Sequence, residues 1–261
     1  MTELILVGAG SWGQRCISVL SSFPGVRLKV AHRDDWKQVI DEGADGVIVC
    51  TPPSSHVEVA THALRKNIPV MIEKPLALSL VEARQLQSFQ NIPILADHTH
   101  LFSDAYQGLR ETASKYKIEK IVSNNYNKGP IRDYSSLWDY GSHDVSMILD
   151  LNREMPQSIS VQETKQSAGS LFKVEMNFEN LTSTSLIGNG GKKKVRQLKV
   201  LAGGLEISYD ERNQPSPPLT NAFKVFINAI HGMHDYRLGI DLSLDVLSIL
   251  EQCDQLLLGH N

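Results

Sequence analysis

Short apolar runs alternate with amphipathic segments along the first hundred residues of the chain. Residues 4–7 form such a run, and glycines follow it at once, which is typical of a buried parallel strand. Residues 55–58 and 79–82 both read Ser-x-x-Glu, the capping box that opens a helix. This alternation of strand and helix predicts a doubly wound parallel sheet. The predicted strands cover residues 4–7, 26–31, 46–50, 69–72 and 92–96, and the predicted helices cover residues 11–22, 36–42, 55–66 and 79–89.

The pattern changes after Asp97, where strand-like runs begin to follow one another without helices between them. Such strands predict an open, mainly antiparallel sheet, and Asn189-Gly190-Gly191 predicts a hairpin turn between two of them. We therefore expect an α/β fold with two domains, a parallel-sheet domain over residues 1–97 and an α+β domain over residues 98–261. The elements expected after Asp97 are helices over 103–116, 135–151, 220–231 and 242–258, strands over 118–127, 157–162, 171–178, 182–187, 195–202 and 205–209, and a proline-rich link over 213–218.

Composition narrows the functional classes. The 261 residues are 41% hydrophobic and 21% charged, which is ordinary for a soluble globular protein. A net charge of −3 gives no electrostatic footprint for nucleic acid. No apolar run is long enough to cross a bilayer, and no secretory leader is visible, so we expect a cytoplasmic protein. Cys16, Cys50 and Cys253 are too scattered for a disulfide framework or a zinc cluster, and we expect reduced thiols.

A glycine-rich motif joins the first predicted strand to the first predicted helix. It reads Gly8-Ala9-Gly10-Ser11-Trp12-Gly13, in the strand-to-helix position at which G-x-G-x-x-G binds a dinucleotide. Gly8 permits the tight turn, Gly10 lets the backbone approach a pyrophosphate, and Gly13 lets helix and strand pack closely. The helix N-terminus adds a partial positive charge. The alternative is a glycine-rich turn that binds no ligand.

The end of the second predicted strand indicates which dinucleotide the chain prefers. The residue about twenty positions past the glycines normally reads the adenosine ribose, and an acid there favours NAD. Here the strand ends in Ala31-His32-Arg33-Asp34, and by register Arg33 takes the place of the acid. An arginine pairs with a 2′-phosphate and stacks on adenine, so NADP is slightly favoured. If the register differs by one residue, Asp34 is the ribose ligand and NAD is favoured.

Two further strands end in residues with a chemical use. Thr51-Pro52-Pro53 closes the third strand, at the edge where such sheets bind ligands. His56 follows in the next helix and either faces the nicotinamide or has a structural role. Glu73-Lys74-Pro75 closes the fourth strand, and the proline favours extended geometry at Lys74. Lys74 then points into a cleft, or it is a solvated lysine in a turn.

An acid and an imidazole share one face of a predicted helix further on. Asp139 and His143 are spaced i and i+4, so the acid is placed to orient the imidazole for proton transfer. Asp144 projects about 100° away from His143 on a helix and is a weaker candidate. The alternative is a surface ion pair.

Two other clusters invite a functional interpretation. Asp97-His98-Thr99-His100 places two histidines on one face of a strand, but no third metal ligand is visible, and a substrate contact by one histidine is favoured. Lys192-Lys193-Lys194 follows the predicted hairpin turn and is either a solvated hairpin or a contact to an anionic substrate.

Together these motifs resemble the Gfo/Idh/MocA family, the group of glucose–fructose oxidoreductase, inositol dehydrogenase and rhizopine catabolism proteins. The resemblance covers most of the chain and rests on Gly8-Ala9-Gly10 with Gly13, Thr51-Pro52-Pro53-x-x-His56, Glu73-Lys74-Pro75, His98-Thr99-His100-Leu101-Phe102 and Asp139-x-x-x-His143. It implies a Rossmann domain and a second domain whose open sheet makes the oligomer contact, so we expect a homo-oligomer, a dimer. It also implies NAD(P)-dependent oxidation or reduction of sugars, cyclitols and related compounds.

Carried over to the matching positions, the resemblance implies that Lys74 and His143 are catalytic, with Asp139 beside them. We expect hydride transfer between nicotinamide and a sugar-like or nucleotide-sugar alcohol or ketone. The segment between Arg33 and Gly46 is shorter than in most members, so the alternative is a non-catalytic dinucleotide- or sugar-binding regulator that kept the fold. The expected cofactor contacts are Gly8, Gly10, Ser11, Trp12, Gly13, His32, Arg33, Thr51, Pro52, His56, Glu73 and Lys74.

Overall fold

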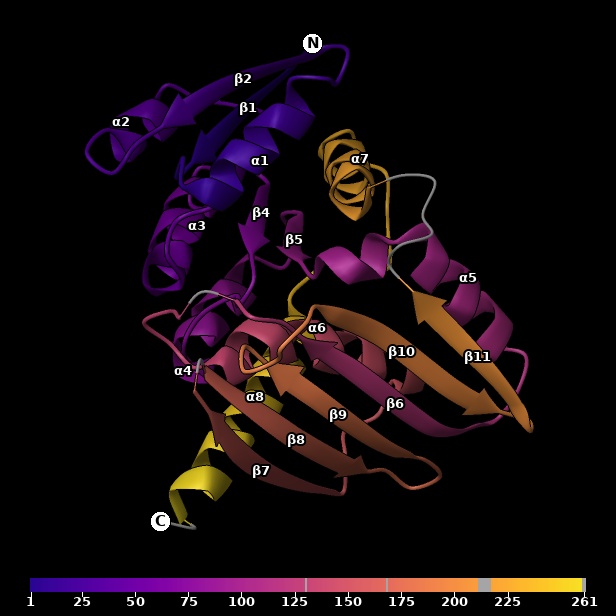
Figure 1. Cartoon of the computed structure of the whole chain (residues 1–261). Helices are drawn as coiled ribbons and strands as arrows, with labels where there is room; N and C mark the ends of the chain where they lie inside the picture. Colours follow the sequence, from indigo (N-terminus) through magenta and orange to yellow (C-terminus); the bar gives the residue numbers. More distant parts are fainter. Residues whose placement is uncertain (130, 168, 211–216, 260–261) are drawn as a thin grey trace. The chain divides into compact units, whose positions relative to one another are not determined.

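The computed structural model describes every residue except 130, 168, 211–216 and 260–261 (Figure 1). The chain divides into two compact units. The first unit comprises Met1–Thr99 and Pro217–Leu244, and the second comprises His100–Ser216 and Asp245–Asn261. The predicted proline-rich link over residues 213–218 lies almost entirely outside the described residues. Within the described part of the chain, no helix is both long enough and apolar enough to span a membrane.

The first unit is built on a five-stranded parallel sheet, as the alternating pattern predicted. Its strand order is β2-β1-β3-β4-β5. All four residues of β3 are buried, which explains why this strand reads as a continuous apolar run. The strands are β1 (Thr2–Val7), β2 (Val26–Ala31), β3 (Gly46–Val49), β4 (Val70–Glu73) and β5 (Ile94–Asp97), and the helices between them are α1 (Ser11–Leu20), α2 (Trp36–Asp41), η1 (Pro53–Ser55), α3 (His56–Leu64), α4 (Leu80–Ala83) and η2 (Arg84–Phe89).

A serine cap forms at only one of the two predicted capping boxes. The hydroxyl of Ser79 accepts the backbone N–H of Glu82 at 3.1 Å and caps α4, although α4 is one turn long and continues as the 3₁₀ helix η2. The box predicted at Ser55 is wrong. Ser55 closes the 3₁₀ turn η1, and its hydroxyl donates to the Pro52 carbonyl at 2.9 Å, so it is directed away from the first N–H groups of α3.

A late segment of the chain returns to the first unit. Helix α7 (Pro218–Ile230) buries an apolar stripe that includes Phe223 and Phe226. The ring of Phe223 contacts Phe23 edge to face at 6.3 Å between centroids, and the ring of His231 lies 3.0 Å from the hydroxyl of Thr2. The division predicted from sequence assigned all of residues 98–261 to the second domain, whereas this helix packs on the parallel sheet.

The second unit contains a six-stranded sheet in the order β11-β10-β6-β9-β8-β7. Neighbouring strands are antiparallel except for β6 and β9, which are parallel, so the sheet is mainly antiparallel as predicted. The hairpin predicted at Asn189-Gly190-Gly191 is wrong, because β6 lies between β9 and β10 and pairs with both. The strands are β6 (Ile118–Tyr126), β7 (Ser158–Gln166), β8 (Gly169–Asn177), β9 (Thr182–Gly188), β10 (Val195–Ala202) and β11 (Leu205–Asp210).

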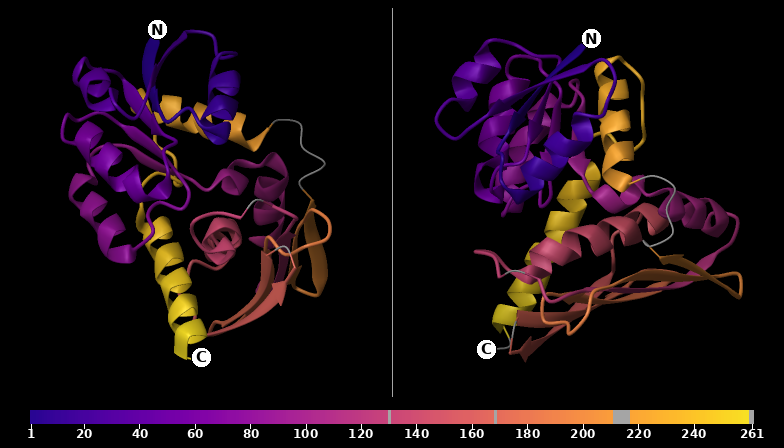
Figure 2. Two further views of the ribbon diagram at one scale, coloured as in Figure 1. Left: turned by 60° about the vertical axis from the view of Figure 1, so that its left-hand side comes forward. Right: turned by 45° about the horizontal axis from the view of Figure 1, so that its top comes forward.

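Helices cover one face of this second sheet. Helices α5 (Asp104–Ala113) and α6 (Ser136–Asn152) lie on the same side of the curved sheet, as both views in Figure 2 show. The covered face carries buried residues such as Phe172, Val174 and Ile187, and these alternate with more exposed residues on the other face. The 3₁₀ turn η3 (Thr99–Phe102) belongs to the second unit from His100 onward, and helix α8 (Asp241–Gly259) belongs to it from Asp245 onward.

Candidate functional site

The glycine loop has the geometry that dinucleotide binding requires. Gly8 has φ of +100°, and a Cβ there would lie 2.7 Å from the Cys50 carbonyl carbon. A Cβ at Gly13 would lie 2.0 Å from the Gly8 carbonyl oxygen. A Cβ at Gly10, the residue that precedes α1, would meet none of the described atoms within 4 Å. Two glycines are therefore required by the backbone, and the third leaves open the space that a pyrophosphate takes at such a helix N-terminus.

The adenosine side of this loop is exposed. β2 ends at Ala31, whose register partner is Val7, the last residue of β1. His32, Arg33 and Asp34 follow and are all exposed. The turn is held by Asp35, whose carboxylate accepts the His32 backbone N–H at 2.7 Å. Arg33 and Asp34 therefore both remain accessible as readers of the ribose.

His56 bridges two loops at the sheet edge. Its side chain is buried, and its Nδ1 lies 2.9 Å from the Pro75 carbonyl while its Nε2 lies 2.8 Å from the Thr51 carbonyl. Burial lowers the pKa of this imidazole. Because both ring nitrogens face backbone oxygens, the structural alternative is favoured for His56, and a contact to nicotinamide stays a prediction.

Lys74 lies beside two buried carboxyl groups. It follows β4 directly, and its backbone N–H donates to Oε2 of Glu73 at 2.9 Å. Glu73 is the register partner of Asp97 at the end of β5. Burial raises the pKa of Glu73 well above its usual range and raises the pKa of Asp97 to about 6, while the charge of Lys74 acts to lower both. In the sequence, Asp97 stands out only within the Asp97–His100 segment, where no third metal ligand is visible.

Two thiols complete the polar surroundings of these carboxyl groups. The Sγ atom of Cys50, the residue after β3, lies 3.8 Å from the Sγ atom of Cys16 on α1, and both residues are free cysteines. The hydrogen bond to Cys16 and burial raise the pKa of the Cys50 thiol well above its ordinary value. A buried thiol of this kind is unreactive.

Helix α6 carries the predicted acid–base residues of the second unit. Asp139 and His143 are both buried, and Asp139 Oδ2 accepts from Nε of Arg132 at 3.0 Å. The ring of His143 meets the ring of His100 edge to face, with centroids 4.5 Å apart. His100 Nδ1 lies 3.3 Å from the hydroxyl of Tyr209. Arg132 and Tyr209 could not be identified from the sequence, because no local motif connects them to α6.

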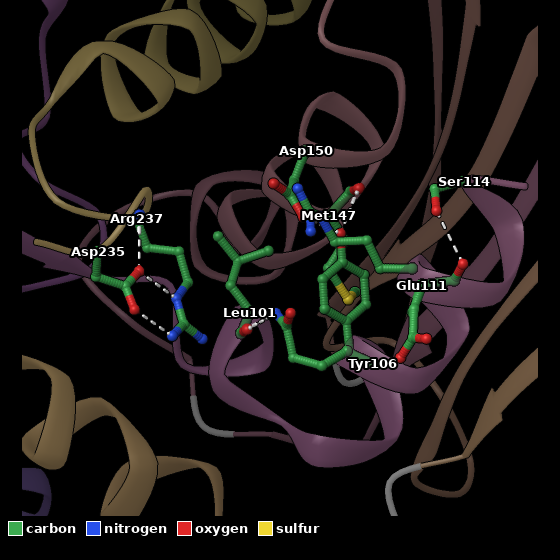
Figure 3. Close-up of polar contacts among 10 residues, drawn as sticks. Leu101, Tyr106, Glu111, Ser114, Met147, Asp150, Asp235 and Arg237 are labelled. Atoms are coloured by element: carbon green, nitrogen blue, oxygen red, sulfur yellow. Dashed lines mark hydrogen bonds and ion pairs between the residues drawn. The ribbon is translucent and has the colours of Figure 1, made fainter.

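The far half of α6 is anchored by α5 (Figure 3). The Tyr106 hydroxyl donates to Oδ2 of Asp150 at 2.7 Å and lies 3.1 Å from the Met147 carbonyl. Arg110 forms an ion pair with Asp150 at 2.9 Å. These buried contacts hold the helix on which Asp139 and His143 lie.

The two histidines of the Asp97–His100 segment have separate partners. His98 Nε2 lies 2.8 Å from the Ser243 hydroxyl, whereas His100 lies in η3 with the contacts given above. The expectation that His98 and His100 share one face of a strand is therefore wrong. Among the described residues, no group of three or more His, Cys, Asp and Glu side chains is placed to hold a metal ion.

Comparison with known proteins supports a dinucleotide-dependent oxidoreductase. Residues 25–91 match the model of the GFO_IDH_MocA family, described as an oxidoreductase family with an NAD-binding Rossmann fold. A 4-carboxy-2-hydroxymuconate-6-semialdehyde dehydrogenase from Sphingobium sp. is 21% identical over 228 residues, which cover 68% of this chain and 72% of that protein.

Two solved structures share the fold of this protein over nearly the whole chain. A protein of Magnetospirillum magnetotacticum MS-1, classed provisionally as an oxidoreductase, is 26% identical with a TM-score of 0.88, covering 97% of this chain and 99% of that one. The fold is also that of scyllo-inositol dehydrogenase from Lactobacillus casei, solved with NAD(H) and scyllo-inositol, at a TM-score of 0.87 and 12% identity over 100% of this chain and 98% of that one.

The fold and the glycine loop thus define an oxidoreductase with an NAD-binding Rossmann domain. The match of residues 25–91 to the GFO_IDH_MocA family model confirms the resemblance seen in the motifs of the chain.

Proposed function

We propose that the protein transfers a hydride between NAD(P) and a sugar-like alcohol or ketone, with Lys74 and His143 as its catalytic residues. The observation that carries the proposal is the placement of the glycine loop, Thr51-Pro52 and Lys74. They follow β1, β3 and β4, which are parallel, so all three lie at one edge of one sheet. Ligands of open parallel sheets bind at this edge.

Each residue has a defined task in this proposal. Gly10, Ser11 and Trp12 hold the pyrophosphate at the start of α1. The bound nicotinamide supplies or accepts the hydride. His143 takes the hydroxyl proton of the substrate during oxidation and returns it during reduction, and Asp139 lies one helical turn away. Lys74 donates a hydrogen bond to the reacting oxygen and stabilises its negative charge.

The names of similar proteins support the proposed substrate class. The scyllo-inositol dehydrogenase carries a cyclitol, and the dehydrogenase from Sphingobium is named for an aldehyde that bears a carboxyl group. We infer a polyhydroxylated or sugar-like substrate for this chain, nucleotide sugars included. Lys192, Lys193 and Lys194 are exposed between β9 and β10, which leaves them accessible to an anionic substituent.

We further propose NADP as the preferred dinucleotide, read by the exposed guanidinium of Arg33. The alternative is that Asp34, also exposed, binds the ribose hydroxyl of NAD.

We also propose a homodimer formed through the second sheet, in the cytoplasm. The face opposite α6 carries the half-buried apolar side chains of Val122, Leu186 and Leu201. The same face also carries the exposed Lys173 and Lys199, so the proposed contact is an apolar patch within it that a partner would cover.

The test is a steady-state assay of nicotinamide absorbance with a panel of sugars, cyclitols and their ketones. Lys74→Ala and His143→Ala should each lower kcat about 10²–10⁴-fold, and the effects should be less than additive because both groups act on one transition state. Fluorescence of Trp12 should report unchanged cofactor affinity in both variants. The exposed Lys115→Ala is the matched control and should keep the parent kcat. Cofactor binding without turnover of any substrate would favour the regulator instead.

A further inference from the structure

The carboxyl groups of Glu73 and Asp97 meet at the ends of β4 and β5, where the proposed reaction assigns Asp97 no task. The two residues are register partners on neighbouring parallel strands, so their side chains project from the same face of the sheet. Glu73 Oε1 and Asp97 Oδ1 are both buried, and neither accepts a hydrogen bond from any donor in the described chain. The side chain of Thr99 also hydrogen-bonds Asp97, but Glu73 Oε1 and Asp97 Oδ1 themselves are enclosed without a donor.

A shared proton resolves this arrangement. An ionised carboxylate only accepts hydrogen bonds, so two ionised groups cannot satisfy each other. One proton turns one carboxyl group into a donor, pairs both oxygens and removes one of two like charges. The raised pKa of Glu73 and the pKa of about 6 for Asp97 agree with one retained proton at neutral pH. The other titratable groups around the pair are the Lys74 ammonium and the thiols of Cys16 and Cys50.

We propose that Asp97 is a positioning residue for Lys74: Asp97 and Glu73 share one proton, and the Glu73 carboxyl held in this way accepts the Lys74 backbone N–H. The 2.9 Å bond from Lys74 N to Glu73 Oε2 is the link between the acid pair and the lysine. Asp97 touches neither substrate nor cofactor in this scheme and acts only through Glu73. The positioning role rests on the proposed function of Lys74, whereas the shared proton does not.

Infrared spectroscopy at pH 8 tests the shared proton directly. The parent protein should keep a carboxylic-acid C=O stretching band, because the pair holds its proton when other carboxyl groups are ionised. Asp97→Asn and Glu73→Gln should each remove the band, since the new amide N–H donates to the remaining carboxylate. Asp144→Asn, which alters another buried acid, should leave the band in place. A parent protein without the band, or a band that survives in either pair variant, would overturn the proposal.

Exchange and kinetics test the positioning role. Asp97→Ala should speed hydrogen exchange of the Lys74 amide and lower kcat about 10–100-fold, because small displacements of a catalytic group have effects of this size. The cofactor KM should stay within about twofold of the parent, and Asp97→Asn should recover both Lys74 protection and most of kcat. Parent-like exchange and turnover in Asp97→Ala would refute the positioning role. If the parent protein turns over no substrate, the proposed function fails, while the infrared and exchange results still decide the fate of this inference.

Discussion

The substitution Asp144→Asn should make the stability of the second unit less dependent on pH. Asp144 is buried between α6 and the sheet, where its Oδ2 accepts from Asn125 Nδ2 at 2.6 Å. Burial raises the pKa of Asp144 from 3.8 to about 6, although Asn125, Ser123 and the charge of Arg196 all act to lower it. The folded protein therefore holds the proton more tightly than the unfolded chain does.

The size of the effect follows from this shift. For an acid whose pKa is raised by folding, the stabilisation is complete below the unfolded pKa of 3.8 and is lost as pH rises through the folded value of about 6. A shift of roughly two units at about 1.4 kcal/mol per unit gives about 3 kcal/mol between pH 4 and pH 8. Asparagine has the same shape and no charge, so the free energy of unfolding of Asp144→Asn, relative to the parent, should rise by about that amount over this range.

Urea unfolding measures this difference. Trp138 lies on α6 in the second unit, where its Nε1 donates to Asp254 at 2.6 Å, and it becomes the sole tryptophan after Trp12→Phe and Trp36→Phe. Unfolding followed by Trp138 fluorescence at pH 4, 6 and 8 then reports this unit. Glu179→Gln, on an exposed turn, should show a flat difference across pH. If the free energy of unfolding of Asp144→Asn relative to the parent stays constant or falls as pH rises, the argument is refuted.

Four further substitutions test the cofactor loop and the sheet. Gly10→Val should fold but bind NAD(P) much more weakly in calorimetric titration, because its side chain fills the open space at the loop. Gly13→Ala should lower the melting temperature instead, because its Cβ would lie 2.0 Å from the Gly8 carbonyl oxygen. Arg33→Asp should lower the ratio of NADP to NAD affinity, and an unchanged ratio would make Asp34 the reader. Leu186→Lys should convert the proposed dimer to a monomer in sedimentation; a parent protein already monomeric at high concentration would contradict the dimer.

Much of the fold was predictable because the informative signals are local. Strand β2 spans residues 26–31 and β10 spans residues 195–202, as predicted, since each apolar run is bounded by turn residues. The predictions that failed concern features whose structure depends on other segments of the chain. The turn at Asn189 looks like a hairpin locally, but β6 lies between the two strands that it joins. The cap at Ser55 failed because the preceding prolines begin a 3₁₀ turn.

The candidate site was predictable only as far as its motifs reach. The glycine loop and Lys74 have motifs that place them at the ends of strands, and these placements are correct. The pairing of Asp97 with Glu73 depends on the register between β4 and β5, and the contact of His100 with His143 depends on the packing of η3 against α6. Neither the register between two strands nor the packing of two helices can be predicted from the spacing of residues along the chain.

The retention of Asp144 in a core has a physical explanation in its hydrogen bonds. Asn125 Nδ2 donates to Asp144, and Arg196 Nε lies 3.4 Å from Asn125 Oδ1, so Asp144 ends a chain of polar groups beneath α6. Asparagine keeps an acceptor for Asn125, whereas leucine removes it and leaves a buried donor unpaired, which costs about 1–3 kcal/mol. Asp144→Leu should therefore be less stable than Asp144→Asn by about that amount at pH 4, where Asp144 in the parent is protonated. Equal stability of the two variants would mean that the network contributes nothing to holding α6, and that the ionisation of Asp144 alone determines its effect on the fold.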